Sequence, residues 1–125
     1  MIDHLSIGTA DIGRARTFYD VTLGALGYQC LSADASAVGY GRHGIALWVL
    51  ASSAPVPANQ ASGLHICFVA PDSDSVRRFY DAALRHGGSD NGEPGIREDY
   101  GSGYYAAFVV DPDGYRIEAY CNVSG

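Results

Sequence analysis

Two histidines and one glutamate are the residues of this chain whose types and positions could perform chemistry together. His4 and His65 recur at a separation of 61 residues within an internal repeat, and Glu118 stands in an otherwise apolar stretch. Two imidazoles and one carboxylate form a facial triad, which leaves positions on a divalent iron, manganese, zinc or nickel ion open for water and substrate. Such an ion can polarise two neighbouring substrate oxygens and stabilise an enediolate or alkoxide. We therefore take His4, His65 and Glu118 as candidate metal ligands.

A structural role is the alternative for each of these side chains. A single histidine at the start of a strand is usually a hydrogen-bonded structural residue, but recurrence in one internal register, together with Glu118, favours a metal site. A buried, unpaired carboxylate is costly, so Glu118 needs a cation, a metal or a proton. Arg116, on the same strand face, is the competing partner.

Tyrosines near the C-terminus are candidates for contacts with a substrate. The segment REDYGSGYYAAF contains two glycines among Tyr100, Tyr104 and Tyr105. A loop with glycine hinges could close over a pocket and donate hydrogen bonds, although a turn packed by its own aromatic rings is the alternative. We assign a catalytic role to Tyr105, as to Glu118, and expect substrate contacts from Tyr100, Tyr104 and Arg116.

Trp48 stands where the first half of the chain has its counterpart of Glu118. Aligning the last strands of the two halves through Gly44 and Gly114 places the indole opposite the carboxylate. A fourth ligand at the symmetric position is therefore missing. We expect Trp48 to form an apolar wall for a substrate, with core packing as the alternative.

An internal repeat predicts the elements that position these side chains. The triplet Phe18-Tyr19-Asp20 recurs as Phe79-Tyr80-Asp81 in the same register as the two histidines. Each half opens with an alternating stretch typical of a strand, continues with apolar residues at helical spacing, and ends with three short strand-like segments. The sequence predicts an α+β fold of two βαβββ modules forming a curved mixed sheet. We expect one domain over 1–125, with a module at 1–51, a linker at 52–62 and a module at 63–125.

Local signals give approximate bounds for these elements. Asp11 and Asp72 can cap the two helices, while Gly27 and the pair Gly87-Gly88 can end them. Asp111-Pro112-Asp113-Gly114 predicts a hairpin turn, because proline presets the first bend and glycine accepts a positive φ. The strands expected after the helices are 28–31, 37–40 and 45–50 in the first half, and 97–100, 105–110 and 115–120 in the second.

Composition narrows the classes of partner. The chain has 125 residues, 47% of them hydrophobic, and a net charge of -6 without a cluster of Lys or Arg. Nucleic acid is an unlikely partner because its affinity rests largely on cations that meet phosphates. The N-terminus lacks the features of a secretory signal and no apolar run is long enough to span a bilayer, so we expect a cytoplasmic protein whose partner is a small molecule. Three cysteines without a CxxC spacing argue against a disulfide framework.

Three stretches of the chain resemble the vicinal oxygen chelate superfamily, which includes glyoxalase I, bleomycin-resistance proteins, fosfomycin-resistance enzymes and extradiol dioxygenases. They are DHLSIGTADIGRARTFYDVTLGALGY, GLHICFVAPDSDSVRRFYDAAL and GYYAAFVVDPDGYRIEAY, and together they cover nearly the whole chain. The resemblance implies paired βαβββ modules around a metal, with His4, His65 and Glu118 matching the family's ligands. Glyoxalase I members carry a fourth, acidic ligand where Trp48 stands here. The site therefore resembles more the three-ligand pattern of fosfomycin transferases and extradiol dioxygenases.

The resemblance implies a glyoxalase-like metalloenzyme acting on a small substrate with vicinal oxygens, as a lyase or isomerase, a transferase or a dioxygenase. The alternative is a metal-free binding protein of the bleomycin-resistance type, which would leave the three candidate ligands without a task. A symmetric homodimer is expected, because family members of this size commonly complete the site between two chains. The sequence allows His4 and Glu118 to meet either within one chain or between two.

Overall fold

The computed structural model describes residues 1–124, which form two units with the same order of elements. In chain order the elements are β1 (Leu5–Thr9), α1 (Ile12–Ala25), β2 (Gln29–Ala33), β3 (Ala37–Gly41), β4 (Ile45–Ala51), β5 (His65–Val69), α2 (Ser73–Arg85), β6 (Ser89–Ile96), β7 (Tyr104–Val110) and β8 (Arg116–Asn122). Short 3-10 helices lie at Gln60–Ser62 and Glu98–Tyr100. The predicted α+β fold with two βαβββ modules is confirmed.

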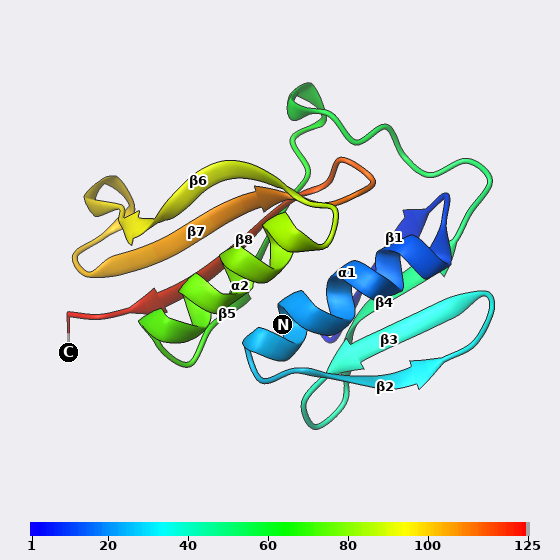
Figure 1. Cartoon of the computed structure of the whole chain (residues 1–125), viewed down its shortest axis with the longest axis horizontal. Helices are drawn as coiled ribbons and strands as arrows, with labels where there is room; N and C mark the ends of the chain where they lie inside the picture. Colours follow the sequence, from blue (N-terminus) through cyan, green and yellow to red (C-terminus); the bar gives the residue numbers. More distant parts are fainter. Residues whose placement is uncertain (125) are drawn as a thin grey trace.

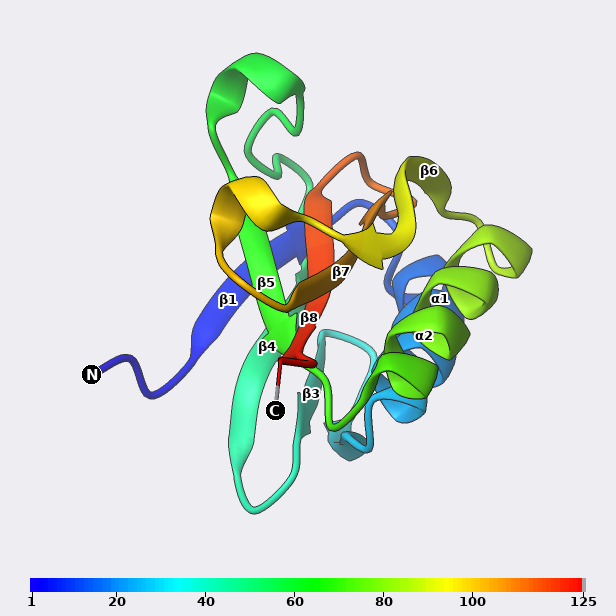
Figure 2. The same cartoon turned by 90° about the vertical axis from the view of Figure 1, so that its left-hand side faces the viewer.

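Each module forms its own four-stranded mixed sheet. The strand orders are β1-β4-β3-β2 and β5-β8-β7-β6, and the opening strand of each sheet pairs in parallel with the closing strand. Figure 1 shows the two sheets beside each other with α1 and α2 in front of them. The view turned by 90° shows both helices on one side (Figure 2), so the opposite faces of the sheets carry no helix.

The two helices begin and end at the residues that the sequence indicates. Asp11 Oδ1 accepts a hydrogen bond from the Arg14 amide at 3.0 Å, and Asp72 Oδ1 accepts one from the Ser75 amide at 2.7 Å. These bonds satisfy amides of the first turn that have no partner inside a helix. Gly27 and Gly87, with φ of 89° and 98°, follow the two helices in the left-handed conformation that glycine accepts without strain.

A buried hydrogen-bond network joins the two modules at one end. The Tyr19 hydroxyl of α1 donates to Asp111 Oδ2 in the turn between β7 and β8, at 2.5 Å. The hydroxyl of Tyr115 donates to the Gly8 carbonyl of β1 at 2.7 Å. Phe18 of α1 and Phe79 of α2 are fully buried and belong to one hydrophobic core cluster with residues of both sheets. The modules therefore share one core, which fixes how their sheets lie relative to each other.

The first strand after α2 differs from the prediction. The expected strand at 97–100 is wrong: β6 covers Ser89–Ile96, and a 3-10 helix covers Glu98–Tyr100. The segment SDNGEPGI contains residues that are depleted in strands, so its sequence gives no strand signal. It forms an edge strand whose pairing with β7 shifts register on both sides of Gly92. An edge strand tolerates such irregularity because only one of its sides must pair.

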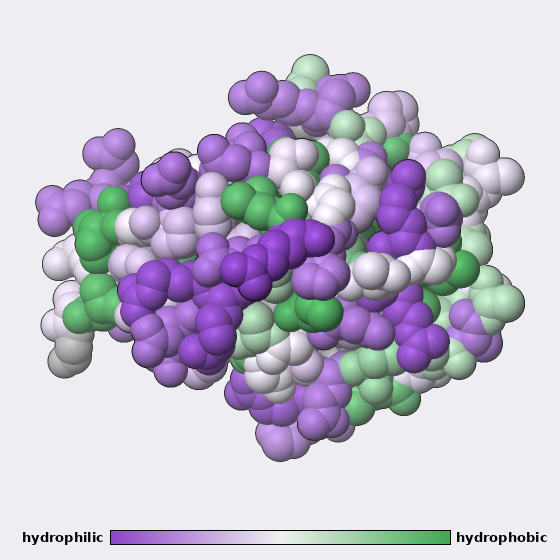
Figure 3. All heavy atoms as spheres, viewed as in Figure 1, coloured by the Kyte–Doolittle hydropathy of each residue, from purple (hydrophilic) through white to green (hydrophobic). Residues whose placement is uncertain are grey.

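The outward side of the helical layer is polar. Strongly hydrophilic residues form a band over α2, and hydrophobic side chains are scattered around it (Figure 3). Among residues 1–124, the helices are too short or too polar to cross a membrane.

Candidate metal and substrate site

His65 and Glu118 come together on the helix-free face of the second sheet. Strands β5 and β8 are neighbours, and their register pairs His65 with Arg116 and Cys67 with Glu118. Side chains alternate along a strand, so the intervening residues Ile66 and Ile117 lie on the other face of the sheet, towards α2, where they are buried. His65 Nε2 lies 2.7 Å from Glu118 Oε1, and Glu118 is only 4% exposed.

Tyr104 holds the second oxygen of the same carboxylate. Its hydroxyl donates to Glu118 Oε2 at 2.5 Å from the neighbouring strand β7. Burial raises the pKa of Tyr104 well above its ordinary value, and the hydrogen bond to Glu118 raises it further. The phenol therefore stays protonated and acts as a hydrogen-bond donor rather than as a base. Both oxygens of Glu118 thus have partners, so its burial carries no unpaired acceptor.

Cys67 is a further member of this group, to which the sequence analysis gave no chemical role. It pairs with Glu118 in the register of β5 and β8. Burial, followed by the nearby charge of Glu118, raises the pKa of the thiol to about 12. The thiol therefore stays protonated at neutral pH and is a poor nucleophile. Its alternation with His65 along β5 is the signal that could have placed it on this face.

His4 lies apart from these residues, directly before the first residue of β1 in the other module. Its Nδ1 is 2.7 Å from Asp3 Oδ2, and both side chains are exposed. Among residues 1–124, no three His, Cys, Asp or Glu side chains lie close enough together to hold a metal ion. An imidazole nitrogen and a carboxylate oxygen are suitable donors for the expected metals, so His65 and Glu118 have donor atoms of the right types for such an ion. The described residues of a single chain supply two of the three expected ligands together.

Aromatic rings line the hollow beside His65 and Glu118. The hollow has a volume of about 310 Å³, and its other walls are Tyr100, Tyr104 and Phe108. The rings of Tyr100 and Tyr104 lie edge to face with their centroids 5.4 Å apart. Tyr100 is 64% exposed, so it lies at the rim of the hollow. The structure thus brings two of the three candidate tyrosines to the carboxylate.

The remaining candidates lie on other surfaces or in a neighbouring hollow. Tyr105 points to the opposite face of β7, where its hydroxyl accepts a hydrogen bond from Arg77 of α2 at 3.0 Å. Trp48 is half-buried in β4 of the first sheet, where its ring packs over Gly39. Arg116 lines a second hollow that also contacts His65. Tyr104 is therefore the tyrosine that contacts Glu118, whereas Tyr105, the predicted catalytic tyrosine, lies away from the site.

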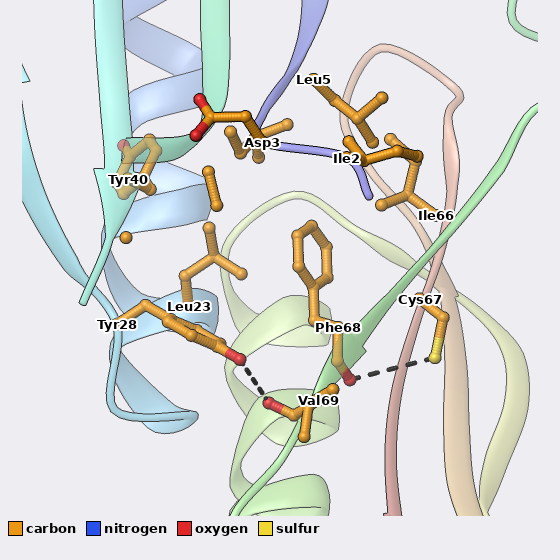
Figure 4. Close-up of a pocket in the computed structure, with 13 residues that line it drawn as sticks. Ile2, Asp3, Leu5, Leu23, Tyr28, Tyr40, Ile66, Cys67, Phe68 and Val69 are labelled. Atoms are coloured by element: carbon orange, nitrogen blue, oxygen red, sulfur yellow. Dashed lines mark hydrogen bonds between the residues drawn. The ribbon is translucent and has the colours of Figure 1, made fainter. Parts of the chain in front are cut away.

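A separate, apolar hollow of about 400 Å³ lies between the modules, near the start of β1 and the end of β5 (Figure 4). Its walls come from the N-terminal segment, both modules and α1: Ile2, Asp3, Leu5, Leu23, Tyr28, Tyr40, Gly41, Ala46, Leu47, Ile66, Cys67, Phe68 and Val69. The Tyr28 hydroxyl bridges the modules here by donating to the Val69 carbonyl at 2.7 Å. Apolar walls with few polar atoms are typical of sites that hold hydrophobic small molecules.

Comparisons with known proteins agree with this architecture. Residues 1–119 match the model of the family described as the Glyoxalase/Bleomycin resistance protein/Dioxygenase superfamily. A glyoxalase/bleomycin resistance protein from Albidiferax ferrireducens has a similar structure, with a TM-score of 0.80 and 28% identity over 94% of this chain and 95% of that one. A glyoxalase-related enzyme from Fulvimarina pelagi has a TM-score of 0.75 and 15% identity, over 98% of this chain and 88% of that one.

A bleomycin resistance determinant encoded on the transposon Tn5 shares the fold at a TM-score of 0.59 and 22% identity, over 94% of this chain and 93% of that one. A search of curated proteins found no significant match.

Proposed function

Because this chain belongs to the glyoxalase/bleomycin resistance protein/dioxygenase superfamily, we propose that it is a mononuclear metalloenzyme acting on a small substrate with adjacent oxygen atoms. One observation carries the proposal. His65 and Glu118 lie 2.7 Å apart on the helix-free face of one sheet, beside a hollow with aromatic walls. An imidazole and a buried carboxylate that share a hollow are a ready pair of metal ligands.

The third ligand in this proposal is His4 from a second copy of the chain. Within one chain His4 is exposed and lies away from His65, although the two are equivalent in the internal repeat. β1 and β5 each pair with only one strand in the described residues, and so each has an open edge. Beside these edges lie the exposed apolar side chains of Ile2, Leu5 and Val69, which a second copy would cover. A homodimer would therefore complete the site and bury these edges.

The residues of the chain have distinct tasks in this proposal. A divalent ion held by His4, His65 and Glu118 would supply a Lewis acid for adjacent substrate oxygens during isomerisation, addition or oxygenation. Tyr104 keeps Glu118 Oε2 occupied through its protonated hydroxyl, which leaves Oε1 directed at His65. Tyr100, at the rim, is placed to contact a substrate and to limit the entry of water.

A metal-free binding protein is the second candidate, and two observations favour it. Glu118 already has hydrogen-bond partners at both oxygens, so its burial does not require an ion. In addition, the apolar hollow between the modules has a volume suited to a drug-sized ligand. This candidate function predicts ligand binding that is indifferent to chelators and insensitive to substitution of His65.

Metal analysis of protein purified without chelators or a metal-binding tag separates these two functions. We expect about one divalent ion per proposed site, lost in His65→Ala and Glu118→Gln and retained in His43→Ala, which removes an exposed histidine of a turn. Titration of the metal-free protein with Zn²⁺, Mn²⁺, Fe²⁺ and Ni²⁺ then ranks the ions. Protein without stoichiometric metal, together with divalent-ion binding that His65→Ala leaves unchanged, would exclude the metalloenzyme.

A further inference from the structure

A second hollow adjoins the one that contains Glu118. It has a volume of about 280 Å³, and its polar walls are His65, Asn91, Arg97 and Arg116. The two hollows share His65, Tyr100 and Phe108, so they are parts of one surface on the helix-free face of the second sheet. A molecule bound beside Glu118 would therefore extend naturally towards the two arginines.

Arg116 has a donor that no residue of the chain satisfies. Its Nε atom is buried and lacks a hydrogen-bond partner among residues 1–124, and its guanidinium makes no ion pair there. A buried donor without an acceptor destabilises the fold, and more so when the group is charged. Arg116 stands opposite His65 in the pairing of β5 with β8 and shares a strand face with Glu118. Arg116 therefore lies next to the proposed metal ligands and lines the hollow, and the described residues supply no acceptor for its Nε atom.

Arg97 is held in place by contacts other than an ion pair. Its guanidinium lies over the ring of Phe108 at 5.4 Å from the centroid and donates to the Glu93 carbonyl. A Cβ atom at Gly92 or Gly95 would come within 3.3 Å or 3.1 Å of its terminal nitrogens. The absence of side chains at these two positions of β6 gives the guanidinium its room. No carboxylate pairs with Arg97 among residues 1–124, so most of its five N–H donors stay available.

We propose that Arg97 and Arg116 bind an oxyanion of the substrate, either a carboxylate or a phosphate. The inference rests on the proposed function, since it assigns a charge to the substrate of that same site. Two guanidiniums without ion-pair partners line one hollow in a chain whose net charge is -6, so the positive charge is local. The planar fork of an arginine matches the geometry of carboxylate and phosphate oxygens. The anionic group would occupy the arginine hollow, and the adjacent oxygens would reach His65 and Glu118.

Anion titrations of the metal-free, chelator-free protein test the inference. Inorganic phosphate and acetate, added at constant ionic strength and followed by calorimetry and thermal shift, represent the two kinds of oxyanion. We expect at least one of them to bind, and we expect Arg97→Gln and Arg116→Gln each to weaken it by about tenfold or more through loss of a charge-assisted hydrogen bond. The anion that binds more tightly identifies the substrate group.

A matched control and a separate readout keep this test distinct from that of the proposed function. Arg85→Gln removes an exposed arginine from the last turn of α2 and should leave anion affinity unchanged. Arg116→Lys, which keeps the charge but loses the fork, serves if Arg116→Gln does not fold. Neither arginine is a metal ligand, so divalent-ion binding should persist in these variants. Anion affinity that is absent, or equal in the wild type and both glutamine variants, overturns the inference even where metal binding is intact.

Discussion

Trp48 and Glu118 occupy equivalent positions in the two sheets. Trp48 pairs with Ser6 on β1, and Glu118 pairs with Cys67 on β5, and Ser6 and Cys67 are themselves equivalent at the 61-residue offset of the repeat. This pairing confirms the alignment of the two halves that the sequence indicates. The internal repeat has therefore kept the backbone geometry of a carboxylate position in the first module while an indole fills it. In the proposed homodimer, a carboxylate at position 48 would add a fourth ligand.

The substitution Trp48→Glu tests this equivalence. We expect it to raise divalent-ion affinity by about tenfold, or roughly 1.4 kcal/mol, relative to Trp48→Gln. Both variants lose the packing of the indole over Gly39, so their melting temperatures should fall by similar amounts. Isothermal titration with Zn²⁺ or Ni²⁺ measures the difference between the two variants. Equal affinities for the ion would show that position 48 does not contact the metal site.

Mixing two variants that each lack one proposed metal ligand determines whether the site lies between chains. His4→Ala keeps His65 and Glu118, whereas His65→Ala keeps His4. If two chains share a site, a heterodimer of these variants contains one complete site and one site that lacks both histidines. We expect each variant alone to lose stoichiometric metal, and we expect co-refolding of the two in equal amounts to restore part of it.

The control for this mixture is the pair His65→Ala and Glu118→Gln, because both changes affect the same half of the site and no heterodimer of them is complete. A site contained in one chain would give no recovery in either mixture. Sedimentation of the unmixed wild-type protein should meanwhile show a dimer.

Tyr104→Phe should cost more stability than the same change at the next residue. The Tyr104 hydroxyl donates to the buried carboxylate of Glu118, and hydrogen bonds to charged groups contribute about 1.5–3 kcal/mol. Tyr105→Phe is the matched control, since its hydroxyl contacts Arg77 on the protein surface, where such contacts contribute about 1 kcal/mol or less. Urea unfolding of the two variants measures both losses. A loss for Tyr105→Phe that equals or exceeds that for Tyr104→Phe contradicts the assigned roles.

Most of the fold follows from local sequence signals because those signals determine the structure locally. Asp11 and Asp72 cap the helices through their own side chains, and the repeat fixes the order of the elements in both modules. β6 has no such signal. Its pairing with β7 depends on the neighbouring strand, and Gly92 and Gly95 serve the packing of Arg97 and Phe108 rather than any strand preference.

The candidate site could be predicted only as far as strand alternation reaches. Alternation places His65 and Glu118 on the same face, and neighbouring strands bring them together. The position of His4 depends instead on how the modules pack, which no local pattern records. Tyr104 could have been preferred over Tyr105, because the turn at 111–114 fixes the register that pairs Phe108 with Glu118, and Tyr104 shares the face of Phe108.

The network between the modules gives stability a defined dependence on pH. Burial raises the pKa of Asp111 above its ordinary value of 3.8, and although hydrogen bonds from Tyr19 and the Tyr115 amide act in the opposite direction, the pKa stays raised. Above pH 3.8 the folded chain therefore retains a proton that the unfolded chain releases. The contribution of Asp111 to the free energy of unfolding must then fall as pH rises through this window.

The substitution Asp111→Asn removes this titration while keeping an oxygen that can accept from the backbone amides of Asp113 and Tyr115. We expect the stability of the wild type relative to Asp111→Asn to decrease as pH rises from 3.8, in urea unfolding at closely spaced pH values.

Asp34→Asn is the control of opposite sign, because hydrogen bonds from Ser36 lower the pKa of that exposed carboxyl. The contribution of Asp34 is present above pH 3.8 and is lost as pH falls below it. A difference between the wild type and Asp111→Asn that stayed constant or grew with pH would mean that Asp111 is charged throughout, and the Tyr19 hydroxyl would then donate to a buried anion that joins the two modules.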